Sequence, residues 1–292
     1  MKIEPYWFLV SYPKSGNTWC RIFLSNLHNL ISVNKGLIKE YELNLKTDLR
    51  TGEIISKRNW LDDQLGFDSS DLDFNELDNL RGEIKYNKSL YSEYKRYYKV
   101  HDSFYTYSNN QKSIVNYKNC SGIVYLIRNP FDVTISLSNF FNWSIDECID
   151  FITDEKASLC NYEKKCDEQV RQFLGDWAYH VNSWINQNKI PKLIIKYEDL
   201  LENPFLHFKS LVKFLNIQVK DNLINQAISN SEFKNLQNKE KSEGGFLETS
   251  DYCSQFFRSG KSGEGIKKLN DIQIERIVNK FSKTLKNFDY LN

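Results

Sequence analysis

The sequence predicts an α/β fold in which a parallel β-sheet is flanked by helices on both faces. Short apolar runs of strand length alternate with segments of helical periodicity, which is the pattern of a parallel sheet covered on both sides. The 292 residues are enough to bury a large core, and neither repeats nor a strong boundary divide them. We therefore interpret residues 1–292 as a single domain.

The first strand is predicted over Tyr6–Val10, where five apolar residues follow one another. Pro13 and Gly16 then interrupt the pattern, and helical periodicity begins at Thr18. A buried strand therefore runs into a short loop that opens a helix. The apolar positions of this helix are Trp19, Ile22, Phe23, Leu27 and Leu30.

A loop of this kind suits the binding of a phosphate. The start of a helix presents free backbone N–H groups and a positive dipole end to an anion. Lys14 adds a charge, Ser15, Asn17 and Thr18 add short polar side chains, and Gly16 allows close approach of the backbone. The familiar ATP-binding loop has a different order, Gly-x-x-x-x-Gly-Lys-Ser/Thr, and this chain lacks it.

The middle of the chain adds two strands. Residues 33–95 are polar and weakly patterned, so we interpret them as an irregular insertion with short helices. Strands are predicted at Tyr97–Val100 and Gly122–Ile127. Pro130 suits the first turn of the next helix, and the capping box Ser144–Glu147 begins another.

The C-terminal half continues the alternation with one more strand and several helices. Its polar stretch is rich in Gly, Ser and Lys, and we interpret it as a flexible cofactor or substrate loop. The predictions are a long amphipathic helix over 167–188, a strand at Lys192–Tyr197, helices at Phe205–Leu215 and 220–229, the flexible loop at 240–266, and a final helix after Asn270.

Polar residues directly follow three of the predicted strands. These are the first loop, His101 and Arg128. Ligands in parallel α/β folds bind beyond the carboxyl ends of the strands. We therefore expect these three segments to meet in one site.

The composition of the chain indicates which classes of partner and which location to expect. The net charge of +1 gives no overall electrostatic reason to bind nucleic acid or an anionic membrane. We expect neither a signal peptide nor a membrane span, because no apolar run is long enough. Six cysteines without a Cys-x-x-Cys pair favour reduced thiols and a cytoplasmic location over a zinc site or a disulfide framework.

Two segments carry a family resemblance. Tyr12–Trp19 resembles the 5′-phosphosulfate loop of sulfotransferases that use PAPS (3′-phosphoadenosine 5′-phosphosulfate), and Arg128–Ser136 is similar to their 3′-phosphate segment. The resemblance implies a fold like that of P-loop kinases. It also implies that Lys14 to Thr18 bind the 5′-phosphate and that Arg128 and Ser136 bind the 3′-phosphate, for which arginine offers a fork of donors.

The C-terminal loop around residue 260 also resembles the family. Phe257–Gly263 is similar to its last phosphate loop, in which Arg258 and Gly260 match and Ser259 stands where the family has a lysine. Whether Lys261 replaces the charge of that lysine stays open. The same likeness assigns Ser259 to this loop and four residues to the adenine side, namely Trp19, Tyr197, Ser231 and Phe233.

The resemblance finally assigns the chemistry. Lys99-Val100-His101 matches the family's Lys-x-His, in which the histidine is the general base, and histidine suits proton transfer near neutral pH. Lys14 and Lys99 would then balance the charge on the leaving phosphate and the moving sulfuryl group. Asp102 replaces an apolar residue common in the phenol and steroid enzymes, which leaves room for a polar acceptor.

These observations together indicate a sulfotransferase that moves a sulfuryl group from PAPS to a hydroxyl or amine of a small molecule. PAP (adenosine 3′,5′-bisphosphate) would be the product, and no metal is expected. Two alternatives stay open: a nucleoside-phosphate kinase, and a non-catalytic nucleotide-binding protein. The sequence sets neither the acceptor nor the choice between a monomer and a homodimer.

Overall fold

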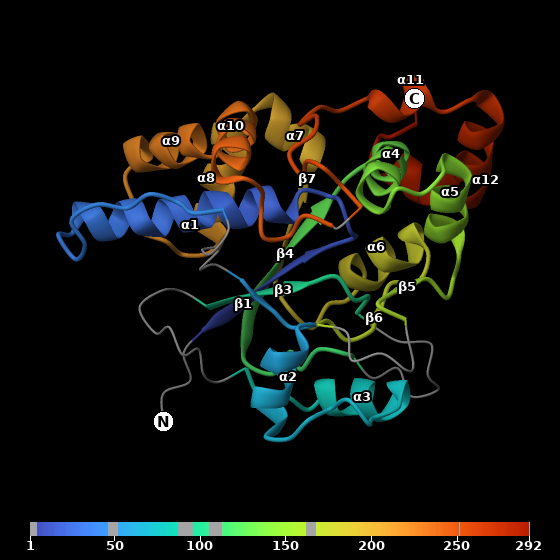
Figure 1. The fold of residues 1–292 in the computed structure, drawn as a ribbon, viewed down its shortest axis with the longest axis horizontal. Helices are drawn as coiled ribbons and strands as arrows, with labels where there is room; N and C mark the ends of the chain where they lie inside the picture. Colours follow the sequence, from blue (N-terminus) through green and yellow to red (C-terminus); the bar gives the residue numbers. More distant parts are fainter. Residues whose placement is uncertain are drawn as a thin grey trace.

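A five-stranded parallel sheet forms the centre of the computed structural model, which describes residues 5–45, 52–86, 96–104, 113–161, 168–250 and 252–291. The strand order is β2-β3-β1-β4-β7, and each pair of neighbours is parallel (Figure 1). This arrangement confirms the predicted fold class. The strands are β1 Tyr6–Ser11, β2 Glu53–Ile54, β3 Arg96–Val100, β4 Cys120–Ile127 and β7 Lys192–Lys196.

Alternate side chains of β1 enter two separate cores. Phe8 and Val10 belong to one cluster of buried residues, whereas Trp7 and Leu9 belong to another. Side chains of a strand alternate between the faces of a sheet, so both faces of β1 must be apolar. This explains why the strand appears in the sequence as an unbroken apolar run.

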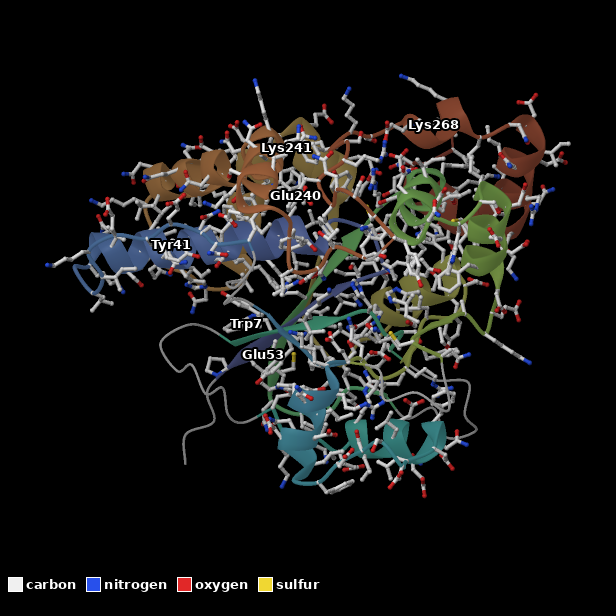
Figure 2. The ribbon with its side chains drawn as sticks, in the orientation of Figure 1. Trp7, Tyr41, Glu53, Glu240, Lys241 and Lys268 are labelled. Carbon is white, nitrogen blue, oxygen red and sulfur yellow. The ribbon has the colours of Figure 1, made fainter. Side chains whose placement is uncertain are left out.

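Helices cover both faces of the sheet, with side chains filling the space between the layers (Figure 2). The cluster containing Trp7 is closed by α1, α8 and α9, and the cluster containing Phe8 is closed by six other helices. The first group is α1 Asn17–Asn34, α8 Pro204–Phe214 and α9 Asp221–Asn230; the second is α2 Arg58–Leu65, α3 Phe74–Arg81, α4 Pro130–Phe141, α5 Ile145–Thr153, α6 Trp177–Ile185 and α12 Asp271–Asn287. Within the described part of the chain, no helix combines the length and apolar character needed to cross a membrane.

Local signals place several helix starts correctly. Asn129 caps α4 by accepting a hydrogen bond from the Asp132 N–H, and Pro130 is its first residue. Ser144 begins α5 with a capping box, and Asn270 begins α12 with another. Each signal satisfies N–H groups that the helix itself leaves unpaired.

The prediction of one helix over 167–188 is wrong in its first part. The helix α6 begins only at Trp177, because Gly175 has a left-handed φ of 64° and the Asp176 side chain caps the next turn. Upstream, β6 Gln172–Phe173 pairs antiparallel with β5 Ser158–Leu159. Residues 162–167 lie outside the described part. The apolar residues before Gly175 therefore reach the core from an extended chain.

The two irregular regions contain more structure than predicted. The insertion 33–95 does hold the short helices α2 and α3, but it also supplies β2 at the edge of the sheet; residues 46–51 and 87–95 are not described. The loop 240–266 is shorter than predicted, because α10 Phe233–Glu243 covers its start and α11 Glu264–Lys268 covers its end. Tyr197 likewise begins a helix, α7 Tyr197–Glu202, and does not end the strand.

Asp102 points into the protein, so it carries no information about the polarity of the acceptor. Its side chain is fully buried, and its carboxylate lies 3.0 and 2.6 Å from the two terminal nitrogens of Arg81. The backbone N–H of Phe173 donates to the same carboxylate at 3.1 Å. Asp102 therefore joins α3, the end of β3 and β6.

We expect Asp102→Ala to lower the free energy of unfolding by about 3–5 kcal/mol, because it removes the two-point partner of the buried Arg81 and leaves it only the longer ion pair with Asp78 at 3.6 Å. Denaturant unfolding monitored by circular dichroism measures this change. Asp221→Ala is a matched control, since Asp221 pairs with Lys209 at the surface and surface pairs contribute little. Equal losses in the two variants would contradict the structural role of Asp102.

Candidate functional site

The sheet brings four predicted site segments to one edge. The strands β1, β3, β4 and β7 end at Ser11, Val100, Ile127 and Lys196. Their parallel registers, such as Val10 beside both Val100 and Tyr125, place these ends together. The four segments that follow are the loop 12–16, His101, Arg128 and Tyr197.

The loop after β1 has an unusual backbone. Lys14 and Gly16 both lie in the left-handed region, with φ values of 68° and 96°. A Cβ atom on Gly16 would lie 2.7 Å from Cδ2 of Tyr197, so a larger residue does not fit. Gly16 is the N-cap of α1 and has no side chain to bond the first-turn N–H groups. The helix therefore presents an uncapped N-terminus beside Lys14.

Buried polar atoms of this loop and its neighbour lack partners. In the described structure, Ser15 Oγ and Arg128 Nε are buried and make no hydrogen bond. Such atoms are normally paired in folded proteins, so both could serve an anionic ligand. In the Asn17 side chain, Nδ2 donates to the Leu9 carbonyl at 3.0 Å and secures α1 to β1, and only the acceptor Oδ1 lacks a partner. Asn17 could therefore offer a ligand mainly its backbone N–H.

The Lys14 ammonium lies against two aromatic rings. Its Nζ is 3.8 Å from the ring centroid of Phe140 and 4.3 Å from that of Phe256. Burial lowers the pKa of Lys14 to about 7, and the nearby charges of Lys99 and Arg128 act in the same direction. Lys14 is thus a cation that an added anion would stabilise strongly.

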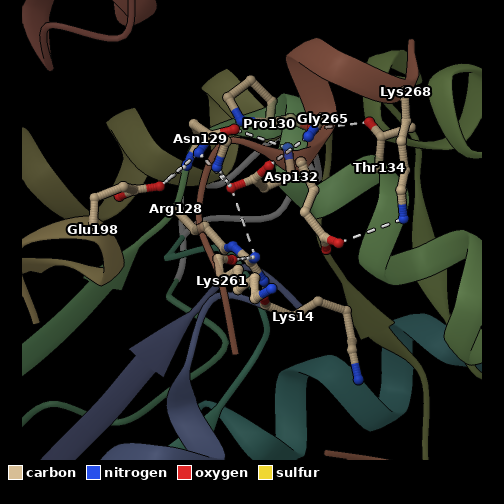
Figure 3. A network of polar contacts seen from close by, with 12 residues as sticks. Lys14, Arg128, Asn129, Pro130, Asp132, Thr134, Glu198, Lys261, Gly265 and Lys268 are labelled. Atoms are coloured by element: carbon tan, nitrogen blue, oxygen red, sulfur yellow. Dashed lines mark hydrogen bonds and ion pairs between the residues drawn. The ribbon is translucent and has the colours of Figure 1, made fainter. Parts of the chain in front are cut away.

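Arg128 connects the loop after β1 with the C-terminal loop (Figure 3). Its Nη1 donates to the Lys14 carbonyl at 3.2 Å, and its Nη2 donates to the Lys261 carbonyl at 2.9 Å. The guanidinium also lies 4.3 Å from the ring centroid of Tyr197. Lys261 thus contributes its carbonyl here, while its side chain is exposed.

Asp132 holds the same C-terminal loop from α4. Its carboxylate accepts the backbone N–H of Gly263 at 2.9 Å and that of Gly265 at 2.7 Å (Figure 3). The Asn129 side chain donates to Asp132 and to Glu198, which belongs to α7. These contacts fix three segments around Arg128.

Arg258 is occupied by an internal partner. Its Nη2 lies 2.6 Å from the Glu264 carboxylate, and although burial opposes it, the hydrogen bond and charge of Arg258 lower the pKa of Glu264 to about 2. Gly260 has a φ of 62°, and a Cβ on it would lie 2.3 Å from the Phe233 ring. Phe233 therefore packs directly on the predicted phosphate loop.

The residues predicted for the adenine side cluster around the start of α1. Trp19 Nε1 donates to the Ser231 carbonyl at 2.9 Å, and its ring lies 6.0 Å from that of Tyr197. The Ser231 hydroxyl accepts from Asn26 and donates to a backbone carbonyl, so the fold already uses it. Ser136 is half-buried on α4, and in the described residues no hydrogen bond joins it to Arg128.

His101 is held in one tautomer. Its Nδ1 lies 2.7 Å from the Ser11 carbonyl, which can only accept, so Nδ1 carries the hydrogen and Nε2 keeps a free lone pair. Burial, reinforced by the charge of Lys99, lowers the pKa of His101 well below its usual 6.5. The ring is therefore neutral at physiological pH and able to accept a proton at Nε2.

Two residues at this site, Glu248 and Arg21, were not predicted from the sequence. Glu248, from the loop after α10, lies 3.1 Å from Lys99 Nζ and 2.5 Å from Arg21 Nη1, and Thr18 Oγ1 donates to it at 3.3 Å. A buried arginine in the otherwise apolar part of α1 was a signal for an internal anion. Nothing local to Glu248 indicates this role, because its partners are more than 140 residues away in the sequence.

Comparison with known proteins finds similarity to sulfotransferases. The family model described as "Sulfotransferase domain" matches residues 4–289. Rat Sulfotransferase 1A1 is 26% identical over 172 residues, covering 58% of this chain and 57% of the relative. Cytosolic sulfotransferase 14 of Arabidopsis thaliana is 27% identical over 163 residues, covering 53% and 46%. The matched segments span about half the length of these relatives.

Solved structures share the fold over nearly the whole chain. Mouse sulfotransferase SULT7A1, in a complex with PAP, superposes with a TM-score of 0.57 at 19% identity and covers 96% of this chain and 84% of its own. Retinol dehydratase, in a complex with retinol and PAP, gives 0.61 at 17% identity and covers 98% and 83%. These likenesses support the fold described above.

We expect Gly16→Ala to destabilise the protein more than Gly36→Ala. Both glycines have positive φ, but a Cβ at Gly36 meets no atom within 4 Å, so that variant measures only the backbone cost of about 1–2 kcal/mol. At Gly16 the contact with Tyr197 adds to this cost. Denaturant unfolding of both variants gives the difference, and equal losses would show that the site does not require glycine at position 16.

Proposed function

The chain belongs to the sulfotransferase domain family, and on this premise we propose that it transfers a sulfuryl group from PAPS to a hydroxyl or amine of a small-molecule acceptor. The observation that carries the proposal is the meeting of four segments at one sheet edge. They bring a lysine-bearing loop at a helix start, a Lys-x-His pair, a buried arginine and a tyrosine ring into one site.

The residues present fit the two anionic ends of such a nucleotide. The N-terminus of α1, Lys14, Ser15 and Thr18 would hold the 5′ end, and the partnerless Ser15 Oγ supports this assignment. Arg128 would hold the 3′-phosphate, for which its partnerless Nε is available. That a related fold was solved in a complex with PAP supports the same ligand here.

Eight further residues would complete the nucleotide site. Arg258 would reach the 3′-phosphate after exchanging Glu264 for it, while Ser259 and Gly260 would offer backbone N–H groups. Ser136 would join them after a change of side-chain position. The rings of Trp19, Tyr197 and Phe233 would border the adenine together with the backbone of Ser231.

His101 is the general base of the proposed reaction. PAPS would supply the sulfuryl group. The acceptor oxygen or nitrogen would attack the sulfur in line, the bond from sulfur to the phosphate oxygen would break, and the acceptor proton would pass to His101 Nε2. Lys14 and Lys99 would stabilise the charge that develops on the phosphate and the sulfuryl oxygens.

For the acceptor we propose a chemical class and no single compound. The relatives solved with androsterone or retinol carry small alcohols, which supports a hydroxyl group on a small molecule. Because Asp102 is buried against Arg81, it gives no preference for a polar acceptor. A panel of hydroxyl and amine acceptors, assayed with PAPS, would identify the class.

We expect PAP to bind in the presence of EDTA, with an affinity that decreases as the pH rises above about 7. Burial holds the pKa of Lys14 near 7, so at higher pH the lysine must take up a proton to bind a phosphate. Calorimetry at pH 8 in two buffers of different ionisation enthalpy measures this uptake. Lys14→Arg, which is always charged, should abolish it.

Two results would contradict this expectation in different ways. Binding that requires magnesium would favour a nucleoside-phosphate kinase. Binding without proton uptake in the unaltered protein would contradict the lowered pKa of Lys14, and unchanged PAP affinity in Lys14→Ala would remove Lys14 from the phosphate site.

We expect His101→Ala to reduce sulfate transfer by about 10²–10⁴-fold, because the acceptor proton loses its base. The affinity for PAP should change little, since lysine, arginine and backbone groups hold the phosphates. His207→Ala, on α8, is the control. In the unaltered protein the rate should stay constant from neutral pH to well below 6.5, because His101 is neutral throughout that range. Near-normal transfer by His101→Ala would show that the base lies elsewhere.

A further inference from the structure

A largely buried carboxylate lies among the cations at the strand ends. Glu248 Oε2 is 3.1 Å from Lys99 Nζ, and Glu248 Oε1 is 2.5 Å from Arg21 Nη1. The Glu248 side chain is 14% exposed and that of Arg21 only 2%. Glu248 thus joins a helix on one face of the sheet to the strand that carries the predicted catalytic lysine.

The third contact of Glu248 reaches the phosphate loop. Thr18 Oγ1 donates to Oε2 at 3.3 Å, so this oxygen is shared between Thr18 and Lys99. A carboxylate oxygen has lone pairs for two donors, and an ammonium has three hydrogens. Lys99 therefore keeps donors for a second anion while it is bound to Glu248.

The loop that carries Glu248 is fixed from two sides. Leu247 N–H donates to the Leu45 carbonyl at 3.0 Å. Downstream, the Glu240 carboxylate on α10, labelled in Figure 2, accepts the N–H groups of Phe256 and Phe257 at 2.6 and 3.0 Å. These contacts set the position of Glu248 independently of Lys99 and make it a firm support for that lysine.

The surrounding charges show why a carboxylate is needed beside Lys99. Burial lowers the pKa of Lys99, and Arg21 and Lys57 lower it further, whereas Glu248 raises it. Glu248 itself stays ionised, because Arg21 and Lys99 hold its pKa well below the ordinary range although burial opposes this. Without it, Lys99 would face cations alone among these groups.

The other titratable groups of the site respond to the same carboxylate. Glu248 raises the pKa of Lys14, as does Cys253, while burial, Lys99 and Arg128 lower it. For His101 the neighbours are Lys99 and His180, which lower the pKa together with burial, and Glu248, which raises it.

We propose that Glu248 is a positioning residue for sulfuryl transfer: anchored by Arg21, it fixes the Lys99 ammonium two residues from His101 and supplies the negative charge that keeps it cationic. The proposal rests on the proposed function for the reaction, but the hold of Glu248 on Lys99 does not. A buried lysine held by a carboxylate from a distant element is preorganised, so it stabilises transition-state charge without first having to reorient.

The first experiment measures the protonation of the Lys99 side chain directly. Nitrogen-15 NMR of the lysine side chains, with Lys99→Arg to assign the signal, follows the titration of Lys99 in the apo protein. Glu248→Gln should lower its midpoint by about one pH unit or more, since the neutral amide removes the counter-charge. Glu248→Asp should restore most of the shift. An unchanged midpoint in Glu248→Gln would overturn the proposal.

The second experiment separates positioning from binding. Glu248→Gln should lower kcat about 10- to 100-fold and move the alkaline limb of its pH profile to lower pH, while PAP affinity stays within about threefold. Glu248→Asp should recover the profile, and Glu155→Gln, in a surface pair with Lys280, should behave as the unaltered protein.

Two outcomes distinguish a failure of the positioning role from a failure of the proposed function. Tighter PAP binding with unchanged kcat in Glu248→Gln would overturn the positioning role and show that the carboxylate competes with the nucleotide. If the unaltered protein neither binds PAP nor transfers sulfate, the proposed function fails, and the NMR titration still decides whether Glu248 controls Lys99.

Discussion

The bridge formed by Arg128 is the constraint on which the candidate site depends. One guanidinium joins the carbonyl of Lys14 to that of Lys261, across 133 residues of sequence in the longer of its two contacts. A planar group with five donors can do this without changing its charge. Because Asp132 fixes the same C-terminal loop through Gly263 and Gly265, that loop lies against the strand ends.

Several cations lie close together at one edge of the sheet, where their burial and mutual repulsion cost free energy. Each of them has a nearby partner that reduces this cost. Lys14 lies against two aromatic rings, Lys99 against Glu248, and Arg258 against Glu264. A buried charge without a partner is costly, so these contacts stabilise the folded protein. A phosphate could replace the aromatic rings beside Lys14 and the Glu264 carboxylate beside Arg258. Glu248 is also paired with Arg21, so it would keep its place when a phosphate binds.

The predicted positions and the observed geometry agree best where a residue follows a strand directly. His101 and Arg128 stand at strand ends, so the parallel registers bring them to the loop after β1. They agree less well for Ser136 and Asn17. Ser136 lies within α4 without a hydrogen bond to Arg128 in the described residues, and the Asn17 side chain turns back to β1. A motif gives the order of residues, but the direction of each side chain depends on its packing.

Local sequence determined the buried strands, the glycine turn at Gly16, the capped helix starts and the Lys-x-His pair. These features arise from interactions between residues a few positions apart, which a pattern can express. Tertiary structure alone decided that Val170 to Leu174 lie outside a helix, that Asp102 pairs with Arg81, and that Glu248 meets Lys99. Each of these depends on desolvation and on partners brought together from distant segments, and no local pattern encodes such a meeting.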